Sequence, residues 1–153
     1  MNSSPENSQT SPEHFELGRR GEELAAAYLQ QAGYRLVASN FTVPVGRNRN
    51  DALINVEIDL VAYEGPVLCF IEVKTRTSDW FAAPSANVDL RKQRQITRAA
   101  RAYRRMLGLV DEVYRFDVVS VLLPPNSTDF EIELTRNFWS EEKFRPFRRP
   151  EAY

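Results

Sequence analysis

The sequence has little of the residues that build disulfide scaffolds, metal-binding fingers and membrane spans. It holds one cysteine and one histidine in 153 residues, Cys69 and His14. A single cysteine excludes an internal disulfide and fits a reducing compartment, and an isolated histidine in a polar stretch is typical of a surface residue. No apolar run is long enough to cross a bilayer, and no apolar signal-peptide core lies near the start. We therefore expect a soluble cytoplasmic protein that binds no membrane.

An excess of charge of one sign is also missing, because the formal net charge is −1. That balance alone gives no reason to expect a polyanionic partner. Between residues 91 and 105, however, seven basic residues occur without an acid: Arg91, Lys92, Arg94, Arg98, Arg101, Arg104 and Arg105. Such a block usually forms the solvated face of a helix, and the alternative is a phosphate-binding surface.

Periodicity and turn residues divide the chain into one domain and two tails. Residues 1–10 are polar and aperiodic, so we expect a disordered tail there. Residues 11–139 have the length and apolar content of a single domain, and residues 140–153 form a basic, aromatic tail without a core pattern. The predicted helices cover 11–32 and 87–107, and the predicted strands cover 34–41, 56–63, 66–76, 114–123 and 130–137.

The predicted elements follow the order α-β-β-β-α-β-β. This order indicates an α/β protein whose mixed sheet is flanked by helices. Ser11 and Pro12 are typical of a helix N-cap and first helical position, and Gly33 of the residue that ends a helix. Residues 44–55 contain turn residues and two arginines, and we expect a flexible loop there.

A carboxylate and a lysine lie inside the predicted strand that contains "CFIEVKTR", residues 69–76. Glu72 and Lys74 are two residues apart, so they point to the same face of the strand. Taken alone, this pair is most simply interpreted as a structural ion pair at the edge of a sheet.

The neighbouring strand supplies a second carboxylate. If Gly65 and Pro66 are the two-residue turn of a hairpin, paired positions sum to 131 and Asp59 lies opposite Glu72. Directly opposed Cβ atoms are about 4.5–5.5 Å apart, and two carboxylates at that distance repel unless a cation lies between them. The opposed pair therefore favours a divalent-ion site over a purely structural ion pair.

Two helical residues can reach the same place. On the helix 11–32, Glu22 lies roughly 90° from the centre of the apolar stripe, so it is a candidate metal ligand; an ordinary flank residue is the alternative. On the helix 87–107, Lys92 falls on the apolar stripe four residues before Ile96. A lysine at such a position extends its ammonium to solvent or points into the site.

Acids and a lysine around a divalent ion suit the hydrolysis of a phosphodiester bond. The ion, Mg²⁺ or Mn²⁺, lowers the pKa of a water molecule and screens the charge of the phosphate. Lys74 stabilises the developing negative charge or orients the attacking water. The basic helix holds the nucleic-acid backbone, with Arg91, Lys92, Arg94, Arg98 and Arg101 as its candidate contacts.

Four segments resemble the YraN family, whose members are largely uncharacterised bacterial proteins. They are "LGRRGEELAAAYLQQAGY", "EIDLVAYEGPVLCFIEVKTR", "VDLRKQRQITRAARAY" and "RFDVVSVLL". The resemblance covers about residues 14 to 139 and places the chain in the PD-(D/E)XK nuclease superfamily, with archaeal Holliday-junction resolvases as relatives. It implies a restriction-endonuclease-like fold, DNA rather than RNA as substrate, and a homodimer.

The resemblance also implies roles for particular residues. Asp59, Glu72 and Lys74 correspond to the catalytic set, and Glu22 to a metal ligand carried by a helix. The sequence departs from the family pattern at Val56, where a glycine is usual, and in the segment 44–55, which is longer than usual.

Three functions are compatible with these features. The first is a metal-dependent endonuclease that acts on DNA, including branched DNA such as a Holliday junction. The second is a nucleic-acid-binding module that grips the substrate without cutting it, and the third is a structural or adaptor protein in which the Glu72–Lys74 pair is simply satisfied. The presence of Asp59, Glu72 and Lys74 together favours the first.

Overall fold

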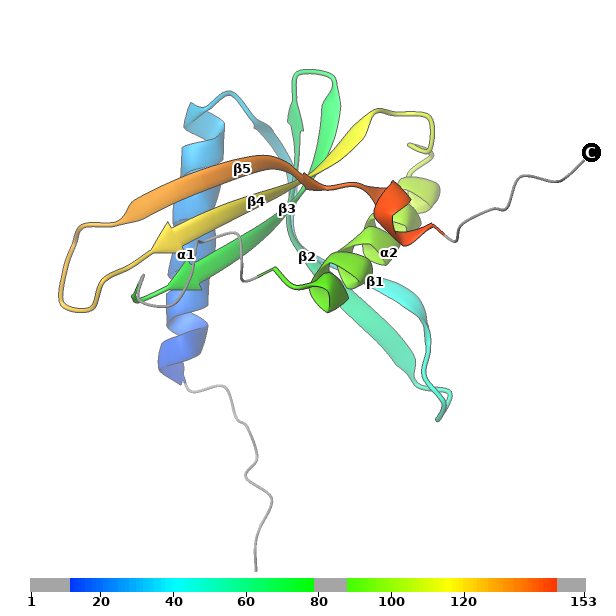
Figure 1. Cartoon of the computed structure of the whole chain (residues 1–153), viewed down its shortest axis with the longest axis horizontal. Coiled ribbons are helices and arrows are strands. Elements are labelled where there is room, and N and C mark those ends of the chain that lie inside the picture. The colour runs from blue at the N-terminus through cyan, green and yellow to red at the C-terminus, as the bar shows by residue number, and fades with distance from the viewer. Residues whose placement is uncertain (1–11, 79–87, 146–153) are drawn as a thin grey trace, which may run out of the picture.

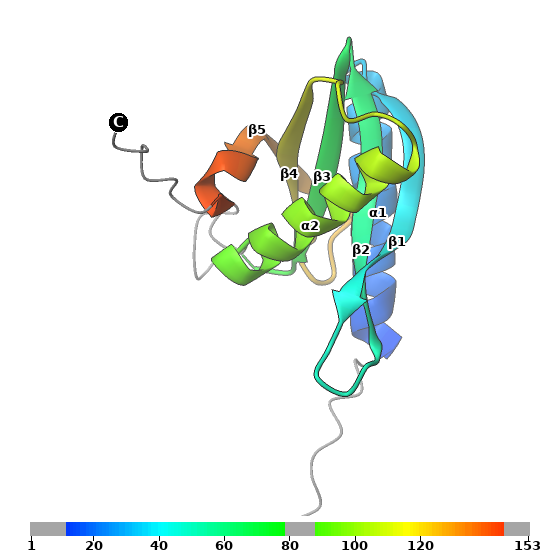
Figure 2. The same cartoon turned by 90° about the vertical axis from the view of Figure 1, so that its right-hand side faces the viewer.

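The protein is a three-layer structure in which one sheet lies between two helices. The computed structural model describes residues 12–78 and 88–145. The sheet has five strands in the order β1-β2-β3-β4-β5, with α1 on one face and α2 on the other (Figures 1 and 2). The elements are α1 Pro12–Gln31, β1 Arg35–Arg47, β2 Leu53–Glu64, β3 Val67–Arg76, α2 Leu90–Met106, β4 Tyr114–Leu122, β5 Glu131–Trp139 and the 3₁₀ helix η2 Glu141–Phe144. The predicted order of helices and strands is confirmed.

The strands β2 and β3 form the central hairpin. Their backbone pairs run from Leu60 with Ile71 to Glu64 with Val67, so the predicted register, in which paired positions sum to 131, is confirmed. Gly65 has a φ of 55°, as the first turn residue of a type II′ hairpin requires. The strands β3 and β4 are parallel and α2 connects them, which makes the sheet mixed. The strands β1 and β5 lie antiparallel at its two edges.

Apolar side chains pack on both faces of the sheet. Between the sheet and α2, Tyr103 of α2 makes edge-to-face contacts with Phe41 and Phe70, with ring centroids 5.2 and 5.5 Å apart. Between the sheet and α1, the helix residues Ala25 and Leu29 are fully buried in a second apolar cluster. Each helix is therefore fixed to the sheet by its apolar face, while its other face meets solvent. No helix in the described part of the chain is both long and apolar enough to cross a membrane.

The expected flexible loop at residues 44–55 is largely wrong, because only residues 48–52 lie outside the two strands. The strands β1 and β2 stay paired up to Arg47 and Leu53, and the far end of this hairpin projects past α2 (Figures 1 and 2). A side chain closes its turn: Asn48 Oδ1 accepts two backbone N–H groups of the following residues at 2.9 and 3.0 Å. Arg98 of α2 donates to the carbonyl of Val45 at 2.7 Å. These bonds order a segment whose polar composition indicated a loop.

The helix α2 begins at Leu90 rather than near residue 87. Asp89 is its N-cap and accepts the backbone N–H of Lys92 at 2.8 Å, which satisfies one of the free donors of the first turn. Residue 87 itself, the predicted N-cap Ser11 and the predicted tail 1–10 lie outside the described residues.

The first residues of the predicted C-terminal tail pack against the domain. Glu141 of η2 is buried and accepts hydrogen bonds from Arg101 and Tyr114. Arg104 of α2 adds an ion pair to the same carboxylate at 3.7 Å. The ordered contacts of the chain therefore reach beyond residue 139.

Candidate functional site

The candidate site begins where β2 and β3 stop pairing. The last backbone pair is Leu60 with Ile71, and Asp59 is the next residue of β2. The alternation of faces breaks here, because Ile58 packs in the cluster under α2 and Leu60 in the cluster under α1, although residues two apart share a face in a regular strand. The Asp59 carboxylate accepts the backbone N–H of Val73 at 2.8 Å. A side chain thus replaces the carbonyl that a continued ladder would supply.

Glu72 is the buried carboxylate of the site. Its side chain is 5% exposed, and its Oε1 lies 3.6 Å from Lys74 Nζ and 3.8 Å from Lys92 Nζ. Its Oε2 has no hydrogen-bond partner among the residues that the structure describes. Burial, with the Asp59 carboxylate as the second cause, raises the pKa of Glu72 to about 8 against the opposing effect of the two lysines. Two cations thus lie beside one oxygen of Glu72, and the other oxygen accepts no hydrogen bond from a described residue.

Three carboxylates form an acidic group, defined as Glu22 of α1 with Glu57 and Asp59 of β2. One oxygen of each lies within 4.8 Å of the others. Asn40 of β1, with its amide nitrogen oriented toward them, donates to Glu57 at 2.9 Å and to Glu22 at 2.8 Å. Burial, followed by repulsion from Asp59 and Glu57, raises the pKa of Glu22 to about 7. Asp59 therefore belongs both to this group and to the pair with Glu72.

Glu22 reaches the sheet because α1 approaches β3 very closely at Gly21. A Cβ atom at Gly21 would lie 1.9 Å from Oγ1 and 2.8 Å from Cγ2 of Thr75, so this contact requires glycine. The next residue along the helix is Glu22, which is partly buried beside β2. The close approach thus positions a helical carboxylate over the sheet.

The structure places the predicted catalytic residues together. Asp59 and Lys74 flank Glu72, and Glu22 of α1 lies beside Asp59. Their expected position at an edge of the sheet is wrong, because β2 and β3 are inner strands with β1 and β4 outside them. The site opens where these inner strands part. Their roles in catalysis and metal binding stay predictions.

Glu57 is the site residue that the sequence reasoning missed. It lies two residues before Asp59 on β2, and that spacing was a usable signal, because it places two acids on one side of a strand. Its position beside Glu22 depends on the path of α1, which the sequence pattern does not give.

The basic residues of α2 are engaged in different ways. Arg94 lies over the ring of Phe144 at 5.6 Å, Arg98 binds the β1 backbone, and Arg101 binds Glu141. Arg91 is exposed and has no hydrogen-bond or ion-pair partner among the described residues. The predicted nucleic-acid contacts therefore divide into residues that contact other parts of the protein and Arg91, which has no such contact within the described ranges.

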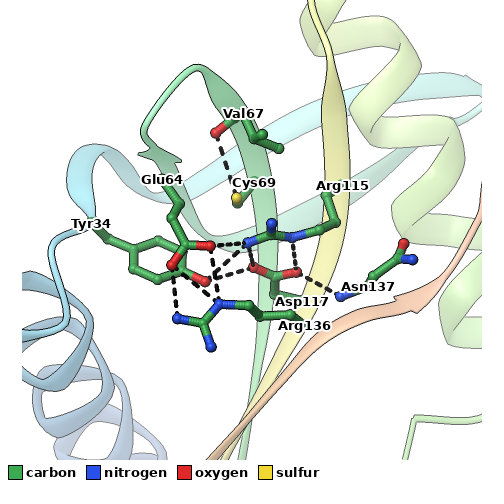
Figure 3. A network of polar contacts seen from close by, with 8 residues as sticks. All are labelled: Tyr34, Glu64, Val67, Cys69, Arg115, Asp117, Arg136 and Asn137. Atoms are coloured by element: carbon green, nitrogen blue, oxygen red, sulfur yellow. Dashed lines mark hydrogen bonds and ion pairs between the residues drawn. The ribbon is translucent and has the colours of Figure 1, made fainter.

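A second polar network lies at the turn end of the sheet and is structural (Figure 3). At its centre is Asp117 of β4, which is fully buried. It accepts hydrogen bonds at 2.7 to 2.9 Å from Arg115, Tyr34 and the backbone of Asn137. Hydrogen bonds from Arg136, and then from Arg115, lower the pKa of Glu64 in the same network to about 2. Every charge here has a partner, so the network joins strands rather than binding a ligand.

Carboxylate oxygens are the donors that hard divalent cations prefer. Asp59 is the central residue, with the unpaired oxygen of Glu72 on the α2 side and the other two members of the acidic group, Glu22 and Glu57, on the α1 side. A cation here would relieve the repulsion that raises the pKa of both Glu72 and Glu22. The donor set therefore fits Mg²⁺ or Mn²⁺.

Comparison with known proteins identifies the family of the chain. A model of the uncharacterised protein family UPF0102 matches residues 21–121, a span that contains the whole candidate site. The chain is 41% identical over 132 residues to a UPF0102 protein of Chlorobium chlorochromatii, covering 83% of this chain and 94% of that protein. It is 43% identical over 112 residues to one of Koribacter versatilis, covering 73% and 72%. It is 40% identical over 116 residues to one of Geobacter sulfurreducens, covering 75% and 83%. The chain belongs to the UPF0102 family, the family of the YraN proteins that its sequence resembles.

Proposed function

We propose that the protein is a cytoplasmic, metal-dependent endonuclease that hydrolyses phosphodiester bonds in DNA. One observation carries the proposal: a buried glutamate, Glu72, has one oxygen beside two lysines and the other unpaired, next to the carboxylate of Asp59. Buried side-chain oxygens generally have a hydrogen-bond partner, so an ion pair alone does not account for this one. A carboxylate that binds a metal ion has such an unpaired oxygen when the ion is absent.

Asp59 and Glu72 would hold the ion, with Glu22 and Glu57 on the far side of Asp59. When bound, the ion lowers the pKa of a water molecule and screens the charge of the phosphate. The protein's own contribution is position. The Val73 N–H fixes Asp59, and burial fixes Glu72 in a low-dielectric environment where charges interact strongly.

Lys74 is the candidate electrophile. Its side chain is 29% exposed and its Nζ is 3.6 Å from Glu72 Oε1, so it can turn from that oxygen toward a phosphate in the site. There it would stabilise the negative charge that develops as the oxygen of water bonds to phosphorus and the ester oxygen leaves. This effect is larger in the transition state than in the bound substrate, so it acts on rate more than on affinity.

The resemblance to junction resolvases makes branched DNA the first substrate to test. Resolution of a four-way junction takes two cuts, so we propose that two copies of the chain act on one junction. Sedimentation of the protein with and without a junction measures this directly. A complex that contains one copy would contradict the proposed dimer without affecting the proposed chemistry.

The test of the activity compares a four-way junction, a linear duplex and a single strand in Mg²⁺, Mn²⁺ or EDTA. The wild type should cut at least one of them with metal and none in EDTA. Glu72→Gln and Lys74→Ala should lose cleavage while keeping the fold and most DNA binding. Asp111→Asn, at an exposed position of the turn between α2 and β4, is the matched control and should cut like the wild type. Tight binding of the junction by the wild type without cleavage in either metal would instead make the protein a binding module.

A further inference from the structure

A polar pocket lies beside Glu72 at the start of α2. It has a volume of about 280 Å³ and is lined by Lys74, Asp89, Arg91, Lys92 and Gln95. Two of these residues, Lys74 and Lys92, are also the two cations that approach Glu72. The pocket and the candidate metal site therefore share a wall, and a group bound in the pocket lies next to the carboxylates.

The pocket has an excess of positive charge. Three cations line it against one carboxylate, Asp89, and an oxygen of that carboxylate is used by the Lys92 backbone N–H at 2.8 Å. The ammonium groups of Lys74 and Lys92 lie 3.6 and 3.8 Å from Glu72, beyond hydrogen-bond distance. Their N–H donors are thus available to an anion. Arg91 has no partner within the described ranges.

The rest of α2 contrasts with its first turn. Arg94, Arg98 and Arg101 are occupied by Phe144, the carbonyl of Val45 and Glu141, respectively. A ligand that used these three arginines would first have to displace contacts that hold β1 and η2 to the helix. A ligand in the pocket displaces no hydrogen bond of Arg91 or of the two ammonium groups.

We propose that Arg91 and Lys92, together with Lys74, form a phosphate-binding subsite that holds a backbone phosphate of a nucleic-acid strand beside the metal site. The identity of the ligand as nucleic acid rests on the proposed function. The subsite itself rests on the pocket and its unpaired donors. It narrows the expected substrate contacts on α2, which ran from Arg91 to Arg101, to the first turn, where a bound phosphate also places the strand against Asp59 and Glu72.

The test measures binding of a linear duplex and a four-way junction in EDTA across a range of salt concentrations. Arg91→Ala and Lys92→Met should each weaken binding and lower the slope of log K against log salt by about 0.9 for duplex DNA. Arg105→Ala is the matched control, since it removes the same charge from an exposed position in the last turn of the same helix. It should leave the slope unchanged. Equal slopes for Arg91→Ala, Lys92→Met and Arg105→Ala would overturn the proposal.

A second arm distinguishes a strand phosphate from a free one. Inorganic phosphate is titrated into labelled protein, and the amide signals of residues 90–92 are followed by NMR. If phosphate shifts these signals in the wild type and not in Arg91→Ala, while DNA affinity is the same in both, the pocket takes a small anion and the proposal fails. If DNA also shifts them and loses affinity with Arg91→Ala, the strand phosphate is confirmed.

Cleavage then separates this proposal from the proposed function. Single-turnover reactions at saturating protein should show that Glu72→Gln does not cleave DNA. The binding titrations should give this variant the same salt slope as the wild type. A wild type that never cleaves, combined with the reduced slope of Arg91→Ala, would refute the nuclease and keep the subsite. A wild type that cleaves, combined with an unchanged slope for Arg91→Ala, would keep the nuclease and refute the subsite.

Discussion

Val73 donates its backbone N–H to the Asp59 carboxylate at 2.8 Å, at the point where the backbone pairing of β2 and β3 ends. Glu72 is the residue immediately before Val73, so the backbone of β3 fixes both carboxylates in place. Their repulsion is therefore a property of the fold and not of two mobile side chains. Burial adds to it, because it removes the water that would otherwise screen them. A protein that keeps such a pair is less stable without a cation than with one.

The first prediction concerns stability and pH without metal. Burial and Asp59 raise the pKa of Glu72 from 4.5 to about 8, so the folded state binds this proton more tightly than the unfolded state. The free energy of unfolding that Glu72 contributes is then fully present below pH 4.5 and falls as pH rises toward 8. Glu72→Gln lacks this titration, so in EDTA it should match the wild type near pH 5 and melt at least about 2–4 °C higher near pH 9.

Metal completes this comparison. Added Mn²⁺ should raise the melting temperature of the wild type, because a ligand stabilises the state that binds it, and should not move that of Glu72→Gln. If Glu72 is only a structural partner of Lys74 and Lys92, the variant should instead melt lower at pH 9, and Mn²⁺ should affect neither protein. Melting curves of both proteins at the two pH values decide between these outcomes.

The second prediction concerns Glu57. Glu57→Gln should weaken Mn²⁺ binding by about tenfold, the size of effect found even for outer partners of a metal site, as measured by calorimetry. It should also bring the pKa of Glu22 down from about 7, since repulsion from Glu57 is one of its causes; NMR titration reads this without any activity. Asp111→Asn is the control. Unchanged Mn²⁺ affinity in Glu57→Gln would place the ion on the α2 side, between Asp59 and Glu72.

The hairpin register was predictable from sequence because its turn is two residues long. Gly65 supplies the positive φ of the first turn position, and the ring of Pro66 fixes its own φ at the second, so every pair follows by counting. That counting placed Asp59 opposite Glu72, and the structure brings these two together. It could not show that the backbone pairing of β2 with β3 ends at Leu60. The end of the pairing depends on contacts with other strands and helices, which local sequence patterns do not record.

Two expectations from the sequence failed for the same physical reason, which is contact between distant parts of the chain. The segment 44–55 looks like a loop because edge strands bury little, yet Arg98 and the Asn48 side chain order it. The arginines of α2 look like a free basic surface because their partners, Phe144 and Glu141, lie about 40 to 50 residues later in the sequence. Periodicity reports which face of a helix is exposed, and it does not report which partner covers that face.

The third prediction separates the structural network from the site. Asp117 is fully buried and bonded to Arg115, so Asp117→Asn should lower the free energy of unfolding by about 3–5 kcal/mol. Tyr34→Phe removes two hydrogen bonds, the one that its hydroxyl donates to Asp117 and the one that it accepts from Arg115, and should cost about 1–2 kcal/mol. The exposed Asp129→Asn should change nothing. Urea unfolding measures all three. Loss of Mn²⁺ binding in a fully stable Asp117→Asn would show that the network belongs to the site after all.

The last prediction compares two glycines of α1 that differ by one helical turn. A Cβ at Gly18 meets no atom within 4 Å, whereas a Cβ at Gly21 lies 1.9 Å from Thr75 Oγ1. Gly18→Ala should therefore stabilise the protein by up to about 1 kcal/mol through helix propensity, and Gly21→Ala should destabilise it by about 1–3 kcal/mol through overpacking. Because relief of that clash moves α1 away from β3, Gly21→Ala should also withdraw Glu22 and weaken Mn²⁺ binding, while Gly18→Ala should not. Equal stability and equal Mn²⁺ affinity in the two variants would mean that Glu22 reaches Asp59 without this close packing.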